Sequence, residues 1–154
     1  MTNSVEGDPS PASGAPSGAT PGSEAVEVPL PQDLTAPRVA RGAVRGLLDR
    51  WRLQSVLEPV LLAVSELVTN ALRHGRPPVG LRLVRRGRSV VVDVHDASKD
   101  LPGAGTSAAE GAESGRGMGI VEALAAEAGT KRLPSDGKVV WARFEAEGGE
   151  EGSR

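Results

Sequence analysis

One apolar stripe, over residues 56–73, restricts the fold of this chain more than any other feature of the sequence. Its apolar residues recur every three or four positions, which is the spacing of one face of an α-helix. The helix is expected to end where Gly75 is followed by Pro77-Pro78, because glycine and proline commonly close helices. The residues of the stripe are Leu57, Val60, Leu61, Val64, Val68 and Ala71.

Shorter patterns predict the remaining elements. An apolar run over Val26–Leu30 ends in a proline-flanked turn and predicts a first strand at the edge of a sheet. Apolar residues at helical spacing predict a helix over residues 36–51, with Asp33 or Thr35 as its cap and Pro37 in its first turn. A third helix and four more strands are predicted, the helix at Gly117–Ala128 and the strands at Val79–Val84, Ser89–His95, Thr130–Leu133 and Lys138–Ala146.

The order of these elements predicts the fold class. Short turns at Arg85–Arg88 and Pro134–Gly137 each join two predicted strands, which favours two antiparallel hairpins. Residues 97–114 have no period, and a loop of that length is usually a functional lid or disordered. Because helices and strands are partly segregated, we expect an α+β fold: a two-layer α/β sandwich whose mixed, mostly antiparallel sheet carries the helices on one face.

Composition sets the size and the chemistry of the domain. Residues 1–23 are almost entirely Ser, Gly, Pro, Ala and Thr with scattered acids, so we expect a disordered tail, and a second disordered end at residues 148–154. Residues 24–147 suffice for one modest core. That core must be aliphatic, because the chain has one Phe, two Trp and no Tyr. The absence of cysteine excludes disulfides, thiolate metal sites and a cysteine nucleophile.

Charge and hydropathy narrow the function classes further. Residues 31–90 carry 11 Arg against 4 acidic residues. These arginines are spaced along helix faces with almost no aromatic companions for base stacking. Solvated helix faces are therefore favoured over an anionic ligand or acidic partner, and direct binding of nucleic acid comes last. No window of the sequence approaches a membrane span, so we expect no contact with a membrane and a cytoplasmic location.

The helix predicted over residues 56–73 carries a first pair of candidate site residues. A step of about 100° per residue places Glu66, Asn70 and Arg73 opposite the apolar stripe, and Glu66 and Asn70 are i,i+4 neighbours. An amide oxygen beside a carboxylate suits Mg²⁺, and the carboxylate can act as a general base. This helix alone favours the simpler interpretation of a solvated face. An asparagine a full turn before the helix end is the argument against it.

Two further segments can contribute to a ligand site. Asp96 follows the apolar run Val90–Val94, and a carboxylate at a strand end can accept hydrogen bonds from the exocyclic amine of a purine, although a turn explains Asp96-Ala97-Ser98 more simply. The segment Gly115-Arg116-Gly117-Met118-Gly119 opens the third predicted helix, where bare backbone and a helix N-terminus favour phosphate and Arg116 can add a charged contact. A flexible loop is its simpler interpretation. It is neither a Walker loop nor a dinucleotide fingerprint.

Taken together, these segments resemble the GHKL (Bergerat-fold) ATPases over about Val26 to Phe144. Within that superfamily the chain is most similar to small stand-alone domains of GC-rich actinobacteria that resemble anti-sigma-factor serine kinases, and its Ala-, Gly-, Arg- and Pro-rich composition agrees. The segments resemble, in order, the N box (Glu66-Leu67-Val68-Thr69-Asn70-Ala71-Leu72-Arg73-His74), a reduced first glycine box (Asp96-Ala97-Ser98), the second glycine box (Gly115-Arg116-Gly117-Met118-Gly119-Ile120-Val121) and the closing strand (Gly137-Lys138-Val139-Val140-Trp141-Ala142).

The resemblance implies ATP and Mg²⁺ as ligands and gives each residue a role. Asn70 would hold the Mg²⁺ that bridges the ATP phosphates, and Asp96 would recognise the adenine amino group. Glu66 would be the catalytic base that orients water or a serine hydroxyl, because phosphoryl transfer needs mainly positioning and charge neutralisation. The other implied nucleotide contacts are Arg73, Ser98, Gly115, Arg116, Gly117, Met118 and Gly119.

Two positions depart from the family pattern. Ser98 and Asp100 stand where Asp-x-Gly-x-Gly would place glycines, which affects the hinge of the lid and not the adenine contact. Lys138-Val139 offers no hydroxyl where relatives often carry a threonine that supports the adenine site through water. We therefore expect ATP to bind more weakly than in relatives with the complete pattern.

The resemblance favours a serine/threonine protein kinase that regulates transcription by partner switching. It would phosphorylate an anti-sigma-factor antagonist; binding of a sigma factor stays open, and a homodimer is compatible with the sequence. The main alternative is a non-catalytic, ATP-dependent protein-binding switch, which would not need Glu66. A histidine kinase fragment would need a phospho-acceptor histidine on a separate helix, whereas His74 ends the N-box helix and His95 lies in a strand. A basic nucleic-acid-binding module is the last alternative.

Overall fold

The computed structural model describes residues 22–98, 118–135 and 137–147. The expectations for residues 1–21, for nearly all of the 97–114 loop and for residues 148–154 lie outside these ranges. In chain order the described elements are β2 (Ser23–Val28), α1 (Ala36–Trp51), a 3₁₀ helix η1 (Gln54–Val56), α2 (Leu57–His74), β3 (Gly80–Arg86), β4 (Ser89–Asp96), a helical segment at 118–124, β5 (Glu127–Arg132) and β6 (Lys138–Glu145).

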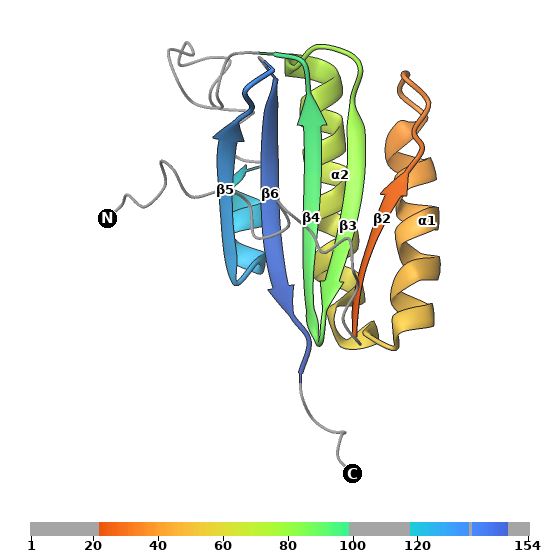
Figure 1. Ribbon diagram of the computed structural model, residues 1–154. Helices are drawn as coiled ribbons and strands as arrows, with labels where there is room; N and C mark the ends of the chain where they lie inside the picture. Colours follow the sequence, from red (N-terminus) through yellow and green to blue (C-terminus); the bar gives the residue numbers. More distant parts are fainter. Residues whose placement is uncertain (1–21, 99–117, 136, 148–154) are drawn as a thin grey trace, which may run out of the picture.

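The strands form one sheet in the order β2-β3-β4-β6-β5, and the helices cover one of its faces (Figure 1). This confirms the α+β two-layer sandwich. Where the sequence allowed a mixed sheet, all four pairings are antiparallel. The reason is that β6 lies between β4 and β5, so strands that run in the same direction are never neighbours.

The main core lies between the sheet and the helices. Val90, Val92 and Val94 alternate along β4 and belong to this core. Because successive residues of a strand point to opposite faces, Asp96 also points toward the helix layer. Residues of the α2 stripe that are completely buried in the core are Val60, Val64 and Val68.

Five elements, α1, α2, β3, β4 and β6, lie within two residues of their predicted bounds. The first strand begins three residues earlier than predicted, at Ser23 instead of Val26, and lies at the sheet edge as expected. Its backbone pairs with β3 as far as Ser23 opposite Arg86. Pairing of backbone groups needs no apolar side chain, so the apolar run marked only part of the strand.

The third helix ends earlier than predicted. The helical state stops at residue 124, although the sequence predicted it to continue to Ala128, and β5 therefore starts three residues before the predicted Thr130. The Ala126 N–H donates to the Arg143 carbonyl at 2.8 Å, and β5 then pairs along β6. Pairing with a neighbouring strand outweighs the helix propensity of this Ala- and Glu-rich run.

The expectation that no window approaches a membrane span is wrong for one segment. Gln54–His74 is long and apolar enough to cross a membrane by length and composition alone, with a mean hydropathy of 1.4. In the folded chain, 44% of the apolar window is buried inside the protein, and α2 packs against α1 and β4. The core of the domain therefore accounts for the apolar character of this helix.

The two predicted capping residues, Asp33 and Thr35, contact each other at the start of α1. Thr35 occupies the N-cap position but makes no side-chain capping bond. Its hydroxyl at 2.5 Å and its N–H at 2.8 Å both donate to the carboxylate of Asp33. These bonds, the hydroxyl contributing most, lower the pKa of Asp33. Pro37 lies in the first turn, as predicted.

Candidate functional site

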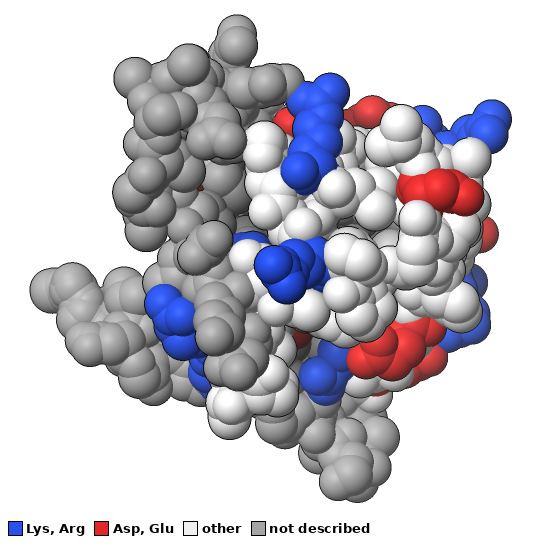
Figure 2. Space-filling model, turned by 90° about the horizontal axis from the view of Figure 1, so that it is seen from above, with Lys and Arg blue, Asp and Glu red and all other residues white. Residues whose placement is uncertain are grey.

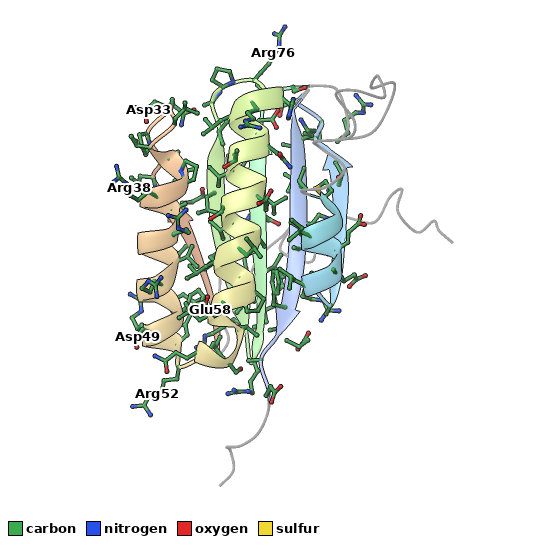
Figure 3. The ribbon with its side chains drawn as sticks, turned by 180° about the vertical axis from the view of Figure 1, so that it is seen from behind. Asp33, Arg38, Asp49, Arg52, Glu58 and Arg76 are labelled. Atoms are coloured by element: carbon green, nitrogen blue, oxygen red, sulfur yellow. The ribbon has the colours of Figure 1, made fainter. Side chains whose placement is uncertain are left out.

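Helix α2 presents Glu66 and Asn70 on the side that faces away from α1. The Arg41 guanidinium donates to the Ser65 hydroxyl at 3.1 Å, so Ser65 faces α1. Glu66 and Asn70 lie about 100° and about 140° further round the helix, which turns them away from α1. The segment 118–124 lies on the side of α2 opposite α1 (Figure 3). Glu66 and Asn70 are half-buried, whereas Arg73 near the helix end is exposed.

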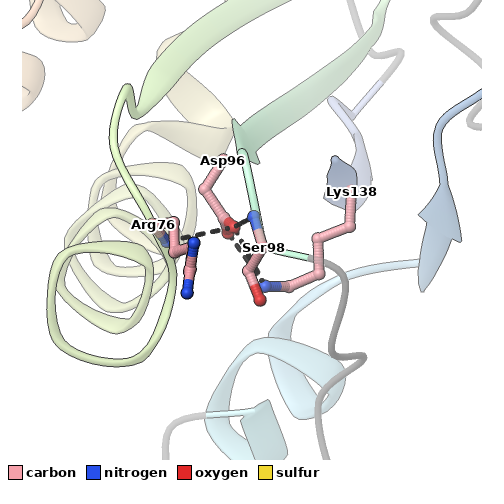
Figure 4. A network of polar contacts seen from close by, with 4 residues as sticks. All are labelled: Arg76, Asp96, Ser98 and Lys138. Carbon is pink, nitrogen blue, oxygen red and sulfur yellow. Dashed lines mark hydrogen bonds and ion pairs between the residues drawn. The ribbon is translucent and has the colours of Figure 1, made fainter. Parts of the chain in front are cut away.

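Asp96 ends β4 and is buried, with 5% of its surface exposed. Its Oδ1 accepts hydrogen bonds from the Ser98 N–H at 2.6 Å and the Arg76 N–H at 3.4 Å. The Lys138 ammonium bridges the carboxylate, at 3.2 Å from Oδ1 and 2.9 Å from Oδ2 (Figure 4). Lys138 is 6% exposed, so the two charges form a buried ion pair between the end of β4 and the start of β6.

Two glycines allow the chain to close tightly around Asp96. A Cβ on Gly75, at the end of α2, would lie 2.5 Å from the Asp96 Cγ. A Cβ on Gly137, just before β6, would lie 2.6 Å from the Asp96 carbonyl oxygen. The Ala97 N–H also donates to the Arg76 carbonyl at 2.8 Å. The end of α2, the end of β4 and the start of β6 therefore meet at this carboxylate.

This junction also fixes the position of the α2 candidates relative to Asp96. Asn70 lies five residues before Gly75, roughly 7.5 Å along the helix axis, and Glu66 lies one turn further. Since Asp96 points toward the helix layer, the predicted Mg²⁺ ligand and the predicted adenine contact lie on the same side of the sheet and near the same end of α2.

The segment 118–124 lies beside α2 over β5 and β6 (Figures 1 and 3). Val121 is fully buried and Met118 packs against the main core, which anchors the segment to the domain. Gly119 is exposed, and a Cβ added to it would meet no atom within 4 Å, so packing among the described residues does not require a glycine there. The other members of this predicted site, Gly115, Arg116 and Gly117, lie outside the described residues.

The sequence drew attention to Lys138 because it offers no hydroxyl where relatives often carry a threonine. The ion pair of Lys138 with Asp96 was not predicted. The available signal was the pattern of the last strand. Val140, Ala142 and Phe144 share the face of β6 that belongs to the main core, and Lys138 stands on the same face. A lysine on an apolar strand face requires an acidic partner, because an unpaired buried charge is costly.

Basic side chains are dispersed on the end of the molecule where β4 and α2 terminate. In the described part of that face, Lys and Arg groups are separated by uncharged residues and by acidic groups (Figure 2). A surface that binds nucleic acid generally presents a continuous basic patch or stripe. The charge distribution seen from this side therefore gives no support to a nucleic-acid-binding module.

Comparisons with known proteins agree with the fold. Residues 30–144 match the family model of the histidine kinase-like ATPase domain. The structure of the RsbU and RsbW domains of Rv1364c from Mycobacterium tuberculosis is similar, with a TM-score of 0.60 and 20% sequence identity over 80% of this chain. The match covers 32% of that protein, so this chain spans about a third of its length. No curated protein matches the sequence significantly.

Proposed function

The chain belongs to the family of histidine kinase-like ATPase domains, and from this premise we propose that it binds Mg-ATP and transfers phosphate to a serine or threonine of a partner protein. The partner would be an anti-sigma-factor antagonist in the cytoplasm, with a sigma factor as a second candidate. The RsbW domain in the similar structure supports this type of kinase. The observation that carries the proposal is the position of the buried Asp96. It ends β4, lies against the end of α2, and is on the same side of the sheet as Asn70.

Asn70 and Glu66 fit a Mg²⁺ site by their donor chemistry. Mg²⁺ prefers oxygen ligands, keeps several waters and usually takes one or two protein ligands together with substrate phosphates. When bound, the ion neutralises charge on the phosphates. Asn70 would hold it, and Glu66 would accept the proton of the attacking serine hydroxyl or water.

A non-catalytic, ATP-dependent protein-binding switch is the second candidate. The departure at Ser98, where the family pattern has a glycine, favours it, because a stiffer loop suits a binding switch better than repeated turnover.

A histidine kinase fragment has less support. His74 is the last residue of α2, and His95 lies in β4. Neither histidine therefore stands on a separate helix, as the phospho-acceptor of a histidine kinase would.

Calorimetric titration with ATP, with and without Mg²⁺, tests the site. Asn70→Ala should remove the part of the affinity that depends on Mg²⁺, about tenfold or more, because the ion loses a protein ligand. Asp96→Asn should weaken the preference for ATP over GTP, because a carboxylate repels the 6-oxo group of guanine and a neutral amide can donate to it. Thr69→Ala, a neighbour on the same helix, is the control and should bind like the wild type. Wild-type binding by both site variants would show that the assignment of the site is wrong.

The same preparations distinguish the kinase from the switch. Glu66→Ala should keep its affinity for ATP but transfer γ-labelled phosphate to a purified antagonist-class protein about 10²–10⁴ times more slowly, because a general base has been removed. Unchanged transfer would exclude Glu66 as the base. Absence of transfer and of ATP hydrolysis in the wild type, with ATP still bound, would favour the switch.

A further inference from the structure

The ion pair between Asp96 and Lys138 occupies the carboxylate to which base recognition is assigned. The side chains of Lys138 and Asp96 are 8% and 2% exposed, and the ammonium lies within hydrogen-bond distance of both carboxylate oxygens. A buried charge is stable when it is paired and hydrogen-bonded. Any other group that approaches this carboxylate must therefore compete with the ammonium of Lys138.

The two oxygens of Asp96 differ in their remaining capacity. Oδ1 accepts from three donors, the Ser98 N–H, the Arg76 N–H and Lys138. Oδ2 accepts from Lys138 alone among the contacts of the described residues. A carboxylate offers about two acceptor sites on each oxygen. Oδ2 is therefore the atom that an incoming amine would use, and it is the atom closest to the lysine.

We propose that Lys138 is a specificity-determining residue that competes with the purine amino group for Asp96. Oδ2 has an acceptor site left, but the Asp96 side chain is only 2% exposed, so an amine can reach Oδ2 only if the ammonium moves away from it. The ammonium can keep its contact with Oδ1. The energy gained from the amine is offset by the contact that is lost. The amino group therefore adds little to the affinity of the wild-type protein. This inference rests on the proposed function, since it takes Asp96 as the residue that contacts the base.

Competition and simple electrostatics predict opposite results when the lysine is removed. Loss of a positive charge from the nucleotide site should weaken the binding of every purine triphosphate by the same factor, because each carries the same negative charge. Loss of a competitor should instead strengthen binding only of a nucleotide that carries the amino group. The ratio of two affinities, for nucleotides with and without that group, isolates the competition because the charge effect cancels.

The experiment is a competition titration with ATP and with purine riboside triphosphate, which lacks the 6-amino group. Wild-type protein should prefer ATP by less than about twofold, whereas Lys138→Met should prefer ATP by about tenfold, the effect of one hydrogen bond to a charged group. Lys131→Met is the matched control. Lys131 of β5 pairs with Val139 of β6, the neighbour of Lys138, and so stands on the other face of the sheet from Lys138. The ratio for Lys131→Met should therefore equal that of the wild type.

A ratio for Lys138→Met equal to that of the wild type would overturn the inference, even if Asn70 still governs the Mg²⁺-dependent affinity. Failure of the wild type and every variant to bind either nucleotide would instead overturn the proposed function. Since Lys138→Met leaves a buried carboxylate without its ion-pair partner, Lys138→Gln is measured as well. Its neutral amide can still donate to Asp96, so its ratio should lie between the other two, and a ratio equal to that of the wild type would count against the inference.

Discussion

Gly75 marks the closest approach of α2 to the buried carboxylate of Asp96. A Cβ at this position would lie 2.5 Å from the Asp96 Cγ and 2.7 Å from the Ala71 carbonyl oxygen, and the latter belongs to the helix backbone. Gly75→Ala should therefore destabilise the protein by about 1–3 kcal/mol, because the helix end or the strand end must move. Urea denaturation measures this change, and weaker ATP binding should accompany it.

The control for this glycine is Gly46, which is exposed within α1 and would bring no Cβ within 4 Å of another atom. Gly46→Ala should stabilise the protein by about 1 kcal/mol, because alanine has the higher helix propensity. Equal effects of the two substitutions would show that the contact around Asp96 is not as tight as described.

At the scale of residues, local spacing made Glu66, Asn70 and Asp96 candidates but favoured a simpler interpretation of each, and the resemblance to the family gave them their roles. Their separate segments each carry a local pattern, namely an i,i+4 pair on a helix and an acid that follows an apolar run. The partner of Asp96 has no such local signal. Lys138 lies 42 residues further along the chain. The two meet only because β4 pairs with β6, in a register that sets Asp96 opposite Lys138.

Arg52 closes α1 in a conformation that favours glycine, with φ of 61° and ψ of 43°. A residue with a Cβ is strained there by about 1–2 kcal/mol. Glycine removes this strain, but it also raises the conformational entropy of the unfolded chain, which offsets part of the gain in stability. Arg52→Gly should therefore stabilise the protein by about 0.5–1 kcal/mol, measured as a shift of the urea midpoint.

The hairpin between β3 and β4 supplies the reverse test. Gly87 has a φ of +62° and no atom within 4 Å of an added Cβ, so backbone strain alone decides the effect of a side chain. Gly87→Ala should destabilise the protein by about 1 kcal/mol. Stabilisation by Gly87→Ala, or a loss of stability in Arg52→Gly, would contradict the assignment of these two backbone conformations.

At the scale of elements, the sequence predicts best the helices and strands whose apolar residues recur at regular spacing. The helices α1 and α2 carry stripes of apolar residues, and their observed bounds lie close to the predicted ones. β5 has no such pattern, because its residues at the sheet edge are only partly buried or exposed. Its existence as a strand from Glu127 depends on backbone pairing with β6, a long-range interaction that no local window contains.

At the scale of the whole molecule, one main core joins α1, α2, the segment 118–124 and the sheet, so we expect these elements to unfold together. Central strands β3, β4 and β6 have a neighbour on each side, whereas β2 and β5 are edges. Amide exchange should therefore be slowest in the central strands. The edge strands can open locally and should exchange faster.

Binding of ATP should change this pattern in a way that depends on where the ligand sits. A ligand that binds only the native state stabilises it by RT ln(1 + [L]/Kd), so at 100 times Kd the global unfolding equilibrium falls about 100-fold. Amides of β4 that exchange by global unfolding should slow by about that factor, measured by mass spectrometry with Mg-ATP. Amides of β2 should slow much less, because this edge can open while the junction at Asp96 stays closed. Unchanged exchange in β4 at saturating ATP would mean that the nucleotide does not bind the folded domain, whatever the individual variants do.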